Sequence, residues 1–412
     1  MSLFESIVET SHHEQVSSSD VIQDALVAIR QHLGMEIAYF SEFVDGRTIF
    51  RRVDAPGREH LIKVGDSHSL DDVYCNHILE GRLPELIPDT SLEPLARSLP
   101  ITSAAPIGSH ASIPIRLPDG RPFGMFCCLS PKANLTLNDR DLGTMRVFAG
   151  LAARQLHLEI GKSQADREKR AAVEAIIDQG GFDIAFQPIV TLASMEVVSV
   201  EALSRFRPQP YRSPDKWFGD AADVGLGVDL ELSAIRAAIA SFPELPSPIG
   251  MSINASPETI VSGRLGEILD GEYLGRTILE ITEHAQVGDY SLLHRELGPL
   301  RDRGMKVAID DAGAGYSGLQ HIVQMVPDII KMDMSLTRGI DRDRARRALA
   351  SAMIFYARET GSAIVAEGIE TSQELLTLKS LGVSRGQGYL LGKPARLNEI
   401  DLPAMPRSKM IA

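Results

Sequence analysis

The residues of this chain that could carry chemistry are polar side chains at the ends of short apolar runs in its C-terminal half. They are Gln187, Glu201, Asn254, Glu280, Asp310, Asp311, Lys331, Glu367 and Gln387. Five carboxylates and an amide brought into one site would repel one another strongly unless cations shared the space. Oxygen ligands without His or Cys favour Mg²⁺ or Mn²⁺ over zinc. The pattern therefore predicts a divalent-metal site, of a kind that is typical for phosphate substrates.

The adjacent acids Asp310 and Asp311 indicate room for two metal ions. Neighbouring side chains diverge on a strand, so the second acid is expected where the strand breaks into Gly313-Ala314-Gly315. One of the two acids could then bridge both ions. Two divalent cations would lower the pKa of a bound water and stabilise the charge that grows on phosphate during in-line displacement.

Two basic residues could assist this chemistry. Lys331 could orient the nucleophile or neutralise the transition state, and its alternative role is a buried ion pair with Asp310 or Asp333. Arg205 lies shortly after Glu201 and is suited to hold a non-reacting phosphate. A surface salt bridge is the alternative for Arg205.

The elements that would position these residues are short apolar strands that alternate with longer helical segments, a rhythm typical of a parallel sheet. The predicted strands are 184–190, 197–203, 250–254, 277–282, 306–310, 328–332, 363–367 and 386–390. Eight strands in about 220 residues indicate a closed (β/α)₈ barrel, with an unusually short first connection. The carboxyl ends of the strands in such a barrel converge on one face, where barrel enzymes place their active sites.

The N-terminal half has a different pattern, with a helix, a strand and hairpins. Residues 21–30 have helical apolar spacing and residues 37–40 read as a strand, while Asp45-Gly46 and Asp119-Gly120 predict hairpin turns. From Leu137 to about Asp178 the spacing is helical again, with charge concentrated at 162–169. We therefore expect an N-terminal segment (1–19), an α+β domain (20–158), a helical linker (159–180) and the barrel (181–405).

Composition limits the partners and the compartment. The formal net charge of −13 disfavours binding to nucleic-acid polymers or anionic membranes. The first residues lack the features of a signal peptide, and no apolar run reaches membrane-spanning length. Cys75, Cys127 and Cys128 are not spaced for a disulfide framework. A cytoplasmic protein is the expectation.

The segment Glu201-Ala202-Leu203 resembles the motif that names the EAL-domain phosphodiesterases of cyclic di-GMP (c-di-GMP) signalling. The resemblance covers about residues 181–394, and the ordered set of motifs makes it specific although each motif alone is weak. The other motifs are Gln187-Pro188-Ile189, Asn254 within 252–256, Glu280-Ile281-Thr282-Glu283, Asp310 to Ser317, Lys331-Met332-Asp333, Ala366 to Glu370 and Gln387-Gly388-Tyr389.

The resemblance implies a role for each matched residue. Glu201, Asn254, Glu280 and Asp310 would hold one metal ion, and Asp310, Asp311 and Glu367 would surround the second. Lys331 would contact the catalytic water. The resemblance makes Lys331, Glu367 and Asp311 the expected catalytic residues. Glu283 would anchor the loop after Asp311. The expected substrate-binding residues are Gln187, Leu203, Arg205, Glu370 and Gln387. The implied reaction is hydrolysis of one phosphodiester bond of c-di-GMP, giving linear 5′-pGpG.

The sequence departs from the common family pattern at two positions. Ala312 stands where Phe usually follows the two aspartates, and Gly318 stands where Ser is common. Neither change removes a ligand, but the smaller Ala312 would leave less apolar packing under the loop. A catalytically silent c-di-GMP receptor would be expected to lack a metal ligand, and an unrelated metal-dependent barrel enzyme would not be expected to reproduce the ordered motifs. An active phosphodiesterase is the prediction.

Residues 20–156 resemble a GAF domain, both in the order of helix, strand and hairpin and in the segment 74–84. Cys75 is not followed by His, which disfavours a covalent chromophore, and isolated histidines such as His68 and His77 are weak indications of a metal or haem site. The resemblance implies a sensor domain for an unknown small ligand, and the alternative is a role in dimerisation only. We expect it to regulate the barrel through the helix over 142–178, within a homodimer.

Overall fold

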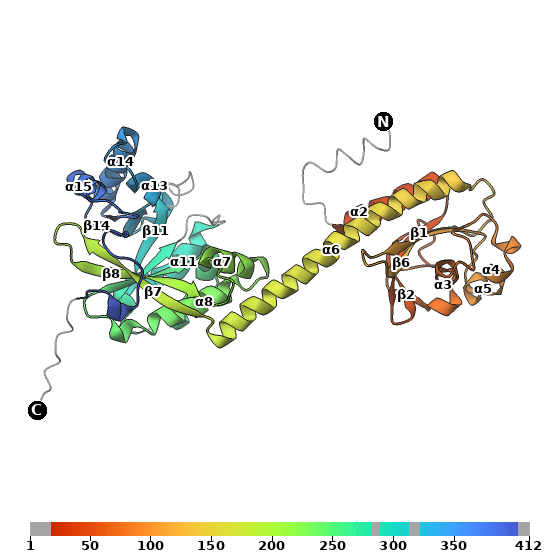
Figure 1. The fold of residues 1–412 in the computed structure, drawn as a ribbon, viewed down its shortest axis with the longest axis horizontal. Coiled ribbons are helices and arrows are strands. Elements are labelled where there is room, and N and C mark those ends of the chain that lie inside the picture. Colours follow the sequence, from red (N-terminus) through yellow and green to blue (C-terminus); the bar gives the residue numbers. More distant parts are fainter. Residues whose placement is uncertain (1–17, 270, 282–288, 313–321, 403–412) are drawn as a thin grey trace, which may run out of the picture. The chain divides into compact units, whose positions relative to one another are not determined.

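The computed structural model describes residues 18–269, 271–281, 289–312 and 322–402. The chain divides into two compact units between Ala165 and Asp166 (Figure 1). The first unit contains an open six-stranded sheet, and the second contains a closed barrel.

The sheet of the first unit is antiparallel, in the order β3-β2-β1-β6-β5-β4. Its strands are β1 (Ile37–Val44), β2 (Arg47–Asp54), β3 (Ser67–Ser69), β4 (Leu86–Ile87), β5 (Ser109–Arg116) and β6 (Pro122–Ser130). Both predicted hairpins are confirmed, because β1 pairs with β2 and β5 pairs with β6. Asp45 and Gly46 both have positive φ, 49° and 74°, as a tight type I′ turn requires.

Helices cover both faces of this sheet. On one face, α2 (Ser18–Leu33) and the beginning of α6 (Asp139–Gln179) bury Leu26, Ile29 and Met145. On the other face, α3 (Tyr74–Leu79), α4 (Pro94–Ser98), α5 (Pro100–Ala104) and their connections form a second apolar cluster. The α+β prediction for this unit is confirmed.

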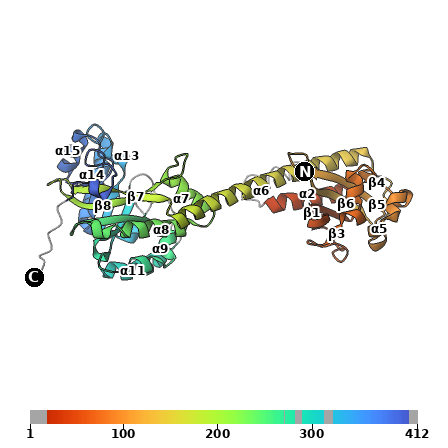
Figure 2. The same ribbon diagram turned by 60° about the horizontal axis from the view of Figure 1, so that its bottom comes forward.

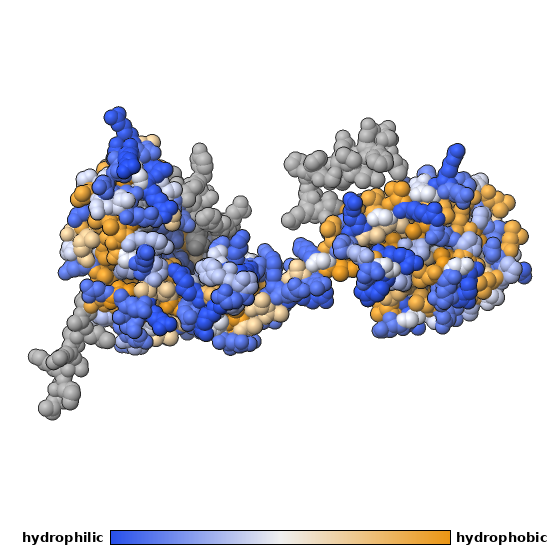
Figure 3. All heavy atoms as spheres, in the orientation of Figure 1, coloured by the Kyte–Doolittle hydropathy of each residue, from blue (hydrophilic) through white to orange (hydrophobic). Residues whose placement is uncertain are grey.

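Helix α6 has 41 residues and contributes to the cores of both units. Met145 and Ala152 are buried in the first unit, whereas Val173 and Ile176 are buried with Phe182 in the second. Between these ends the side chains are mostly exposed, and Figure 3 shows this stretch as largely hydrophilic. The long helix predicted from Leu137 to about Asp178 is therefore confirmed. Among the described residues, none of the helices combines the length and the apolar character that a membrane span requires.

The second unit is a closed barrel in the strand order β10-β11-β12-β13-β14-β7-β8-β9. Its strands are β7 (Phe182–Thr191), β8 (Val197–Phe206), β9 (Gly250–Ala255), β10 (Thr277–Ile281), β11 (Lys306–Ala312), β12 (Ile329–Met332), β13 (Ala363–Ala366) and β14 (Arg385–Gly386). Each strand overlaps one of the predicted strands, so the predicted barrel is confirmed.

Strand β7 departs from the parallel order that the sequence predicts. It pairs antiparallel with β8 and with β14, whereas the remaining neighbours pair parallel. The expectation of a parallel sheet is wrong at this strand, because residues 192–196 alone form the unusually short first connection, from β7 to β8. That length suffices for a hairpin but not for a parallel crossover.

The helices of the second unit lie around the outside of the strands (Figures 1 and 2). They are α7 (Pro214–Asp223), α8 (Gly227–Ile239), α9 (Pro257–Val261), α10 (Leu265–Ile268), α11 (Tyr290–Asp302), α13 (Met334–Thr337), α14 (Arg344–Thr360) and α15 (Ser372–Leu381).

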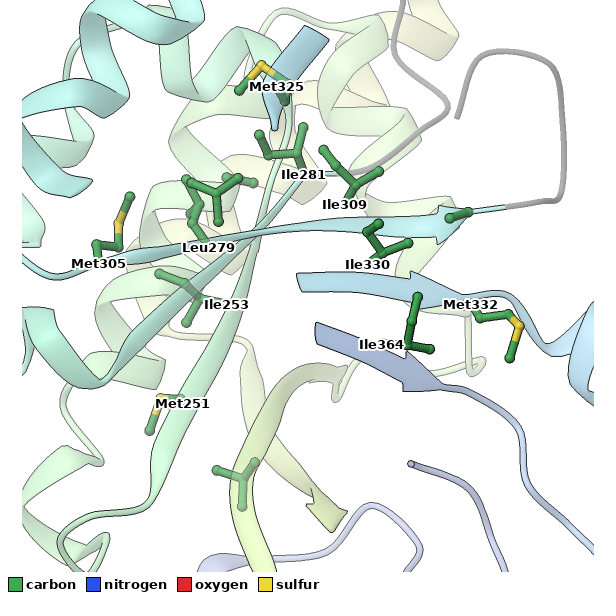
Figure 4. Close-up of a cluster of buried hydrophobic side chains, with 14 of the residues drawn as sticks. Met251, Ile253, Leu279, Ile281, Met305, Ile309, Met325, Ile330, Met332 and Ile364 are labelled. Atoms are coloured by element: carbon green, nitrogen blue, oxygen red, sulfur yellow. The ribbon is translucent and has the colours of Figure 1, made fainter. Parts of the chain in front are cut away.

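Side chains alternate between the two faces of the barrel strands. Leu279 and Ile281 belong to the apolar cluster outside the strands, together with Ile253, Ile309 and Ile330 (Figure 4). Glu280, which lies between Leu279 and Ile281 on β10, therefore points into the barrel. On the neighbouring strands the same alternation directs polar side chains into the barrel and apolar side chains toward the surrounding helices.

We expect Leu279→Ala to lower the free energy of unfolding by about 2–5 kcal/mol, because Leu279 is fully buried between strands and helices. Leu376→Ala is the matched control, since Leu376 is 65% exposed on α15, and its effect should stay within about 0.5 kcal/mol. Urea denaturation measures both. Equal effects of the two substitutions would contradict the assigned packing.

Candidate active site

Lys331 on β12 lies at the centre of a cluster of carboxylates inside the barrel. Its Nζ is 2.7 Å from Glu280 Oε2, 2.8 Å from Glu367 Oε1, 2.9 Å from Asp310 Oδ1 and 3.4 Å from Glu201 Oε2. The side chain is 1% exposed. Of the two ion pairs considered for Lys331, the one with Asp310 is present. Asp310 Oδ1 accepts no hydrogen bond in this contact, and three other carboxylates also contact the ammonium. Asp333 instead caps α13 by accepting a hydrogen bond from Ser335 N.

Burial and the neighbouring charges together shift the pKa values of the ionisable groups in this cluster. Burial alone would lower the pKa of Lys331, but the surrounding carboxylates, Asp310 foremost, raise that pKa well above its usual value. Burial raises the pKa of Glu280 well above the ordinary range and that of Glu367 to about 8, although Lys331 opposes both shifts. One ammonium is therefore too little positive charge for these buried carboxylates. A divalent cation would relieve the excess.

Side-chain amides fix the orientation of Glu201. Gln387 Nε2 donates to Glu201 Oε2 at 2.6 Å and to Gln187 Oε1 at 3.0 Å, and Asn254 Nδ2 donates to Glu201 Oε1 at 3.2 Å. Gln187 Nε2 in turn donates to Gly392 O at 3.1 Å. Burial opposes ionisation of Glu201, but Lys331 and these amide donors outweigh burial and lower its pKa.

A bulge in β11 turns two adjacent acids toward one site. Asp310 and Asp311 together oppose a single residue of β12, because Ile309 pairs with Ile330 and Ala312 pairs with Met332. Asp311 adopts φ 54°, a left-handed conformation that Asp tolerates better than most residues. The strand includes Asp311 and ends at Ala312, directly before the segment 313–315 where the sequence predicts its break. Gly313 to Gly315 and Gly318 lie outside the described residues.

The bulge creates a group of oxygen ligands. One carboxylate oxygen from each of Asp310, Asp311 and Glu367 lies within 4.8 Å of the other two. The backbone next to them is firmly packed, since Ala312 is fully buried. A set of carboxylates with an adjacent amide fits a hard cation such as Mg²⁺ or Mn²⁺.

A pocket of about 480 Å³ adjoins the cluster, and Asn254 belongs to both. Leu203 and Arg205 line this pocket. Arg205 forms no salt bridge with a described residue, and its Nη1 donates to Ser204 O, so the surface ion pair considered for it is not found there.

Sequence reasoning missed two acids of this pocket, Asp215 and Glu231. Glu231 accepts hydrogen bonds from Ser256 N at 2.8 Å and Ser256 Oγ at 2.9 Å, and burial raises its pKa. Asp215 lies in the first turn of α7, where an acid is ordinarily read as a helix-start signal. Neither residue follows a strand, so the strand-end pattern could not select them.

Glu370 is the predicted residue in the described part of the chain that is brought neither into the cluster nor into the lining of the adjoining pocket. Glu370 is 41% exposed and pairs with Arg338. Glu283 lies outside the described residues.

The fold and the site together define an α/β barrel protein with an acidic site of oxygen ligands at its mouth. The chain belongs to the EAL-domain family, because the model of the EAL domain matches residues 169–394, more than half of the chain. The model of the GAF domain matches residues 18–156. Both predicted resemblances are confirmed.

Relatives support this assignment. The chain is 31% identical over 240 residues to the cyclic di-GMP phosphodiesterase PA2567 of Pseudomonas aeruginosa, covering 55% of this chain and 41% of that protein. It is 32% identical over 249 residues to the probable cyclic di-GMP phosphodiesterase PdeG of Escherichia coli, covering 57% and 48%. The solved complex of the phosphodiesterase PaMucR with c-di-GMP matches with a TM-score of 0.50 and 25% identity, over 56% of this chain and 98% of that one. The chain thus spans less than half the length of these two curated relatives.

We expect Lys331→Met to lower the free energy of unfolding by about 3–5 kcal/mol in EDTA at neutral pH, because it leaves buried carboxylates without their cation. Urea denaturation measures the change, and added Mg²⁺ should restore part of it. Lys379→Met, at an exposed position of α15, is the matched control with an effect within about 0.5 kcal/mol. If both variants unfold like the parent protein, Lys331 does not carry the charge balance of the site.

Proposed function

We propose that this chain is a metal-dependent phosphodiesterase that hydrolyses c-di-GMP to linear 5′-pGpG. The observation that most supports this proposal is the contact of Lys331 with Glu201, Glu280, Asp310 and Glu367 inside the barrel. The relatives named as c-di-GMP phosphodiesterases support the choice of substrate. Free, buried cysteines fit a reducing compartment, so the proposal includes a cytoplasmic location.

The donor set supports binding of two Mg²⁺ or Mn²⁺ ions. Glu201, Asn254, Glu280 and Asp310 would hold one ion, and Asp310, Asp311 and Glu367 would hold the other. When bound, the two ions would supply a water of lowered pKa and positive charge facing the phosphate.

The protein's own residues complete the chemistry. Lys331 Nζ lies within 3.4 Å of carboxylates from both ligand groups, so its ammonium can hold the attacking water and offset charge that develops on the phosphate. Gln387 and Gln187 keep Glu201 in one orientation through the amide chain. Such a preorganised arrangement avoids reorganisation during the reaction.

The adjoining pocket would hold the nucleotide. Arg205 would bind the phosphate that does not react, and Leu203 would contact an apolar face of the ligand. The role of Glu370 in the substrate shell stays a prediction.

A catalytically silent c-di-GMP receptor is the rival function, but every metal ligand implied by the motifs is present in the sequence. Incubating the protein with c-di-GMP and Mg²⁺, followed by chromatography of the nucleotides, distinguishes the two. Accumulation of pGpG supports the phosphodiesterase. Tight binding without turnover would refute it, and absence of both would favour an unrelated barrel enzyme.

We expect Glu201→Ala and Asp310→Ala to reduce the rate of c-di-GMP hydrolysis by at least about a thousandfold, because each removes a ligand from the proposed metal site. Glu267→Ala, at an exposed position of α10, is the matched control and should leave the rate unchanged. Circular dichroism checks the fold of each variant. Near-normal turnover of either ligand variant at saturating Mg²⁺ would overturn the ligand assignment.

We infer that the GAF domain regulates the barrel in response to a small ligand, within a homodimer. The first unit contains a cavity of about 60 Å³, which has room for only a very small ligand, and its lining includes Thr48, Tyr74 and His110. Burial lowers the pKa of His110 to about 3, so the imidazole is neutral at physiological pH. Helix α6 supports coupling, because residues of one continuous helix are packed into the cores of both units.

We expect a protein that begins at Asp166 to differ from the full chain in turnover by about fivefold or more, or in oligomeric state. This boundary keeps Val173 and Ile176, which the barrel unit needs for its own core. Steady-state kinetics and sedimentation velocity measure the two properties. If neither property changes, the GAF domain neither regulates the barrel nor holds the dimer together.

A further inference from the structure

A second cavity, of about 430 Å³, lies at the opposite end of the barrel from the acidic cluster. Its lining comes from the first residues of β8, β9, β10, β11 and β14. On β11, for example, the cavity is lined by Lys306, whereas Asp310 of the acidic cluster lies four residues further along the strand. The two sites therefore occupy the two mouths of one barrel.

A layer of apolar side chains separates the two mouths. Ile189, Ile278, Ala308, Ile329 and Val365 form a buried cluster of their own, and each is at most 7% exposed. The strand alternation places Ile278 and Ala308 below Glu280 and Asp310 on the same inward face. A ligand in the lower cavity would therefore not reach the acidic cluster.

More cationic than acidic side chains line the lower cavity. It is lined by Arg276, Lys306 and Arg385, and by one acid, Glu196, which accepts a hydrogen bond from Ser194 Oγ. Lys306 and Arg385 form no ion pair within the described residues. Such convergence of cations in a cleft is unexpected in a chain of net charge −13, and it focuses a positive potential there.

Arg276 is held in place by neutral groups. Its Nε donates to Ile249 O at 2.8 Å, and its Nη2 donates to Leu245 O, Pro246 O and Ile249 O at 2.9, 3.0 and 2.6 Å. These carbonyl oxygens orient the guanidinium but do not neutralise it. Burial lowers the pKa of Arg276 relative to a free arginine, although Tyr273 and Glu272 nearby oppose this shift.

The remaining lining combines one buried hydroxyl with apolar surface. Ser199 is 3% exposed, lines the cavity and forms no side-chain hydrogen bond with the described part of the chain. Val198, Ile249 and Ile278 supply apolar walls. An oxyanion could thus meet cationic donors and a hydroxyl while an organic body contacts the walls.

We propose that this lower cavity binds a phosphate monoester of mononucleotide size. Arginine and lysine side chains bind phosphate oxygens strongly, and a doubly charged monoester matches several cations better than a monocarboxylate does. The volume lies in the range of small-molecule sites. The proposal concerns a site separate from the acidic cluster and does not depend on the proposed phosphodiesterase activity.

The test is isothermal titration of the full chain with 5′-GMP, ribose 5-phosphate, acetate and inorganic phosphate, in EDTA to suppress metal-dependent binding at the acidic cluster. We expect saturable binding of at least one of the two esters, at one site per chain, and none of acetate. The double variant Lys306→Gln/Arg385→Gln should weaken ester binding by about tenfold or more, because it removes two charge-assisted donors.

Arg295→Gln is the matched control, since Arg295 is 66% exposed on α11 and should leave the affinity unchanged. Retained c-di-GMP turnover or an unchanged circular dichroism spectrum verifies that the double variant is folded. Absence of saturable ester binding, equal ester affinity in the double variant, or binding of inorganic phosphate alone would overturn the proposal.

Discussion

A single ammonium group among buried carboxylates is the constraint on which the barrel unit depends. The carboxylates raise the pKa of Lys331, while burial raises the pKa values of Glu280 and Glu367. Such a cluster is stable only if each charge has partners, since removing one partner from a buried set is costly. The amide chain to Glu201 and the bulge in β11 satisfy this requirement locally. The same shortage of positive charge favours a divalent cation at this mouth of the barrel.

Much of this arrangement follows from the sequence. Polar residues that end apolar runs, such as Glu280 and Lys331, do converge, because strand alternation and barrel closure leave them no other direction. The antiparallel direction of β7 was not predicted, because short apolar strands look alike in either direction, although the short first connection marked an irregularity there. The conformation of Asp311 also escaped prediction, because it results from the local register between β11 and β12 rather than from a residue type. Asp215 and Glu231 lie on helices α7 and α8, where acids have many ordinary roles.

For helix α6, the sequence predicts which residues are buried and which are exposed. It does not predict whether the helix couples the two units energetically. Apolar residues at helical spacing near Met145 and Val173, with a charged stretch between them, predict two buried ends and an exposed middle. The structure has this distribution. Coupling depends on the free-energy difference between two conformations of the helix, and hydrophobic periodicity gives no information about that difference.

Closure of the barrel between β7 and β14 has a consequence for biosynthesis. The ring closes through its first and last strands, and Gln387, just beyond β14, donates to Glu201 on β8. A nascent chain on the ribosome that has exposed the earlier strands still lacks both the closing pair and this donor. Domains generally fold as units once their sequence has emerged. The site is therefore assembled only when almost the whole domain has been translated, so an interrupted translation product carries the acids without the geometry that orders them.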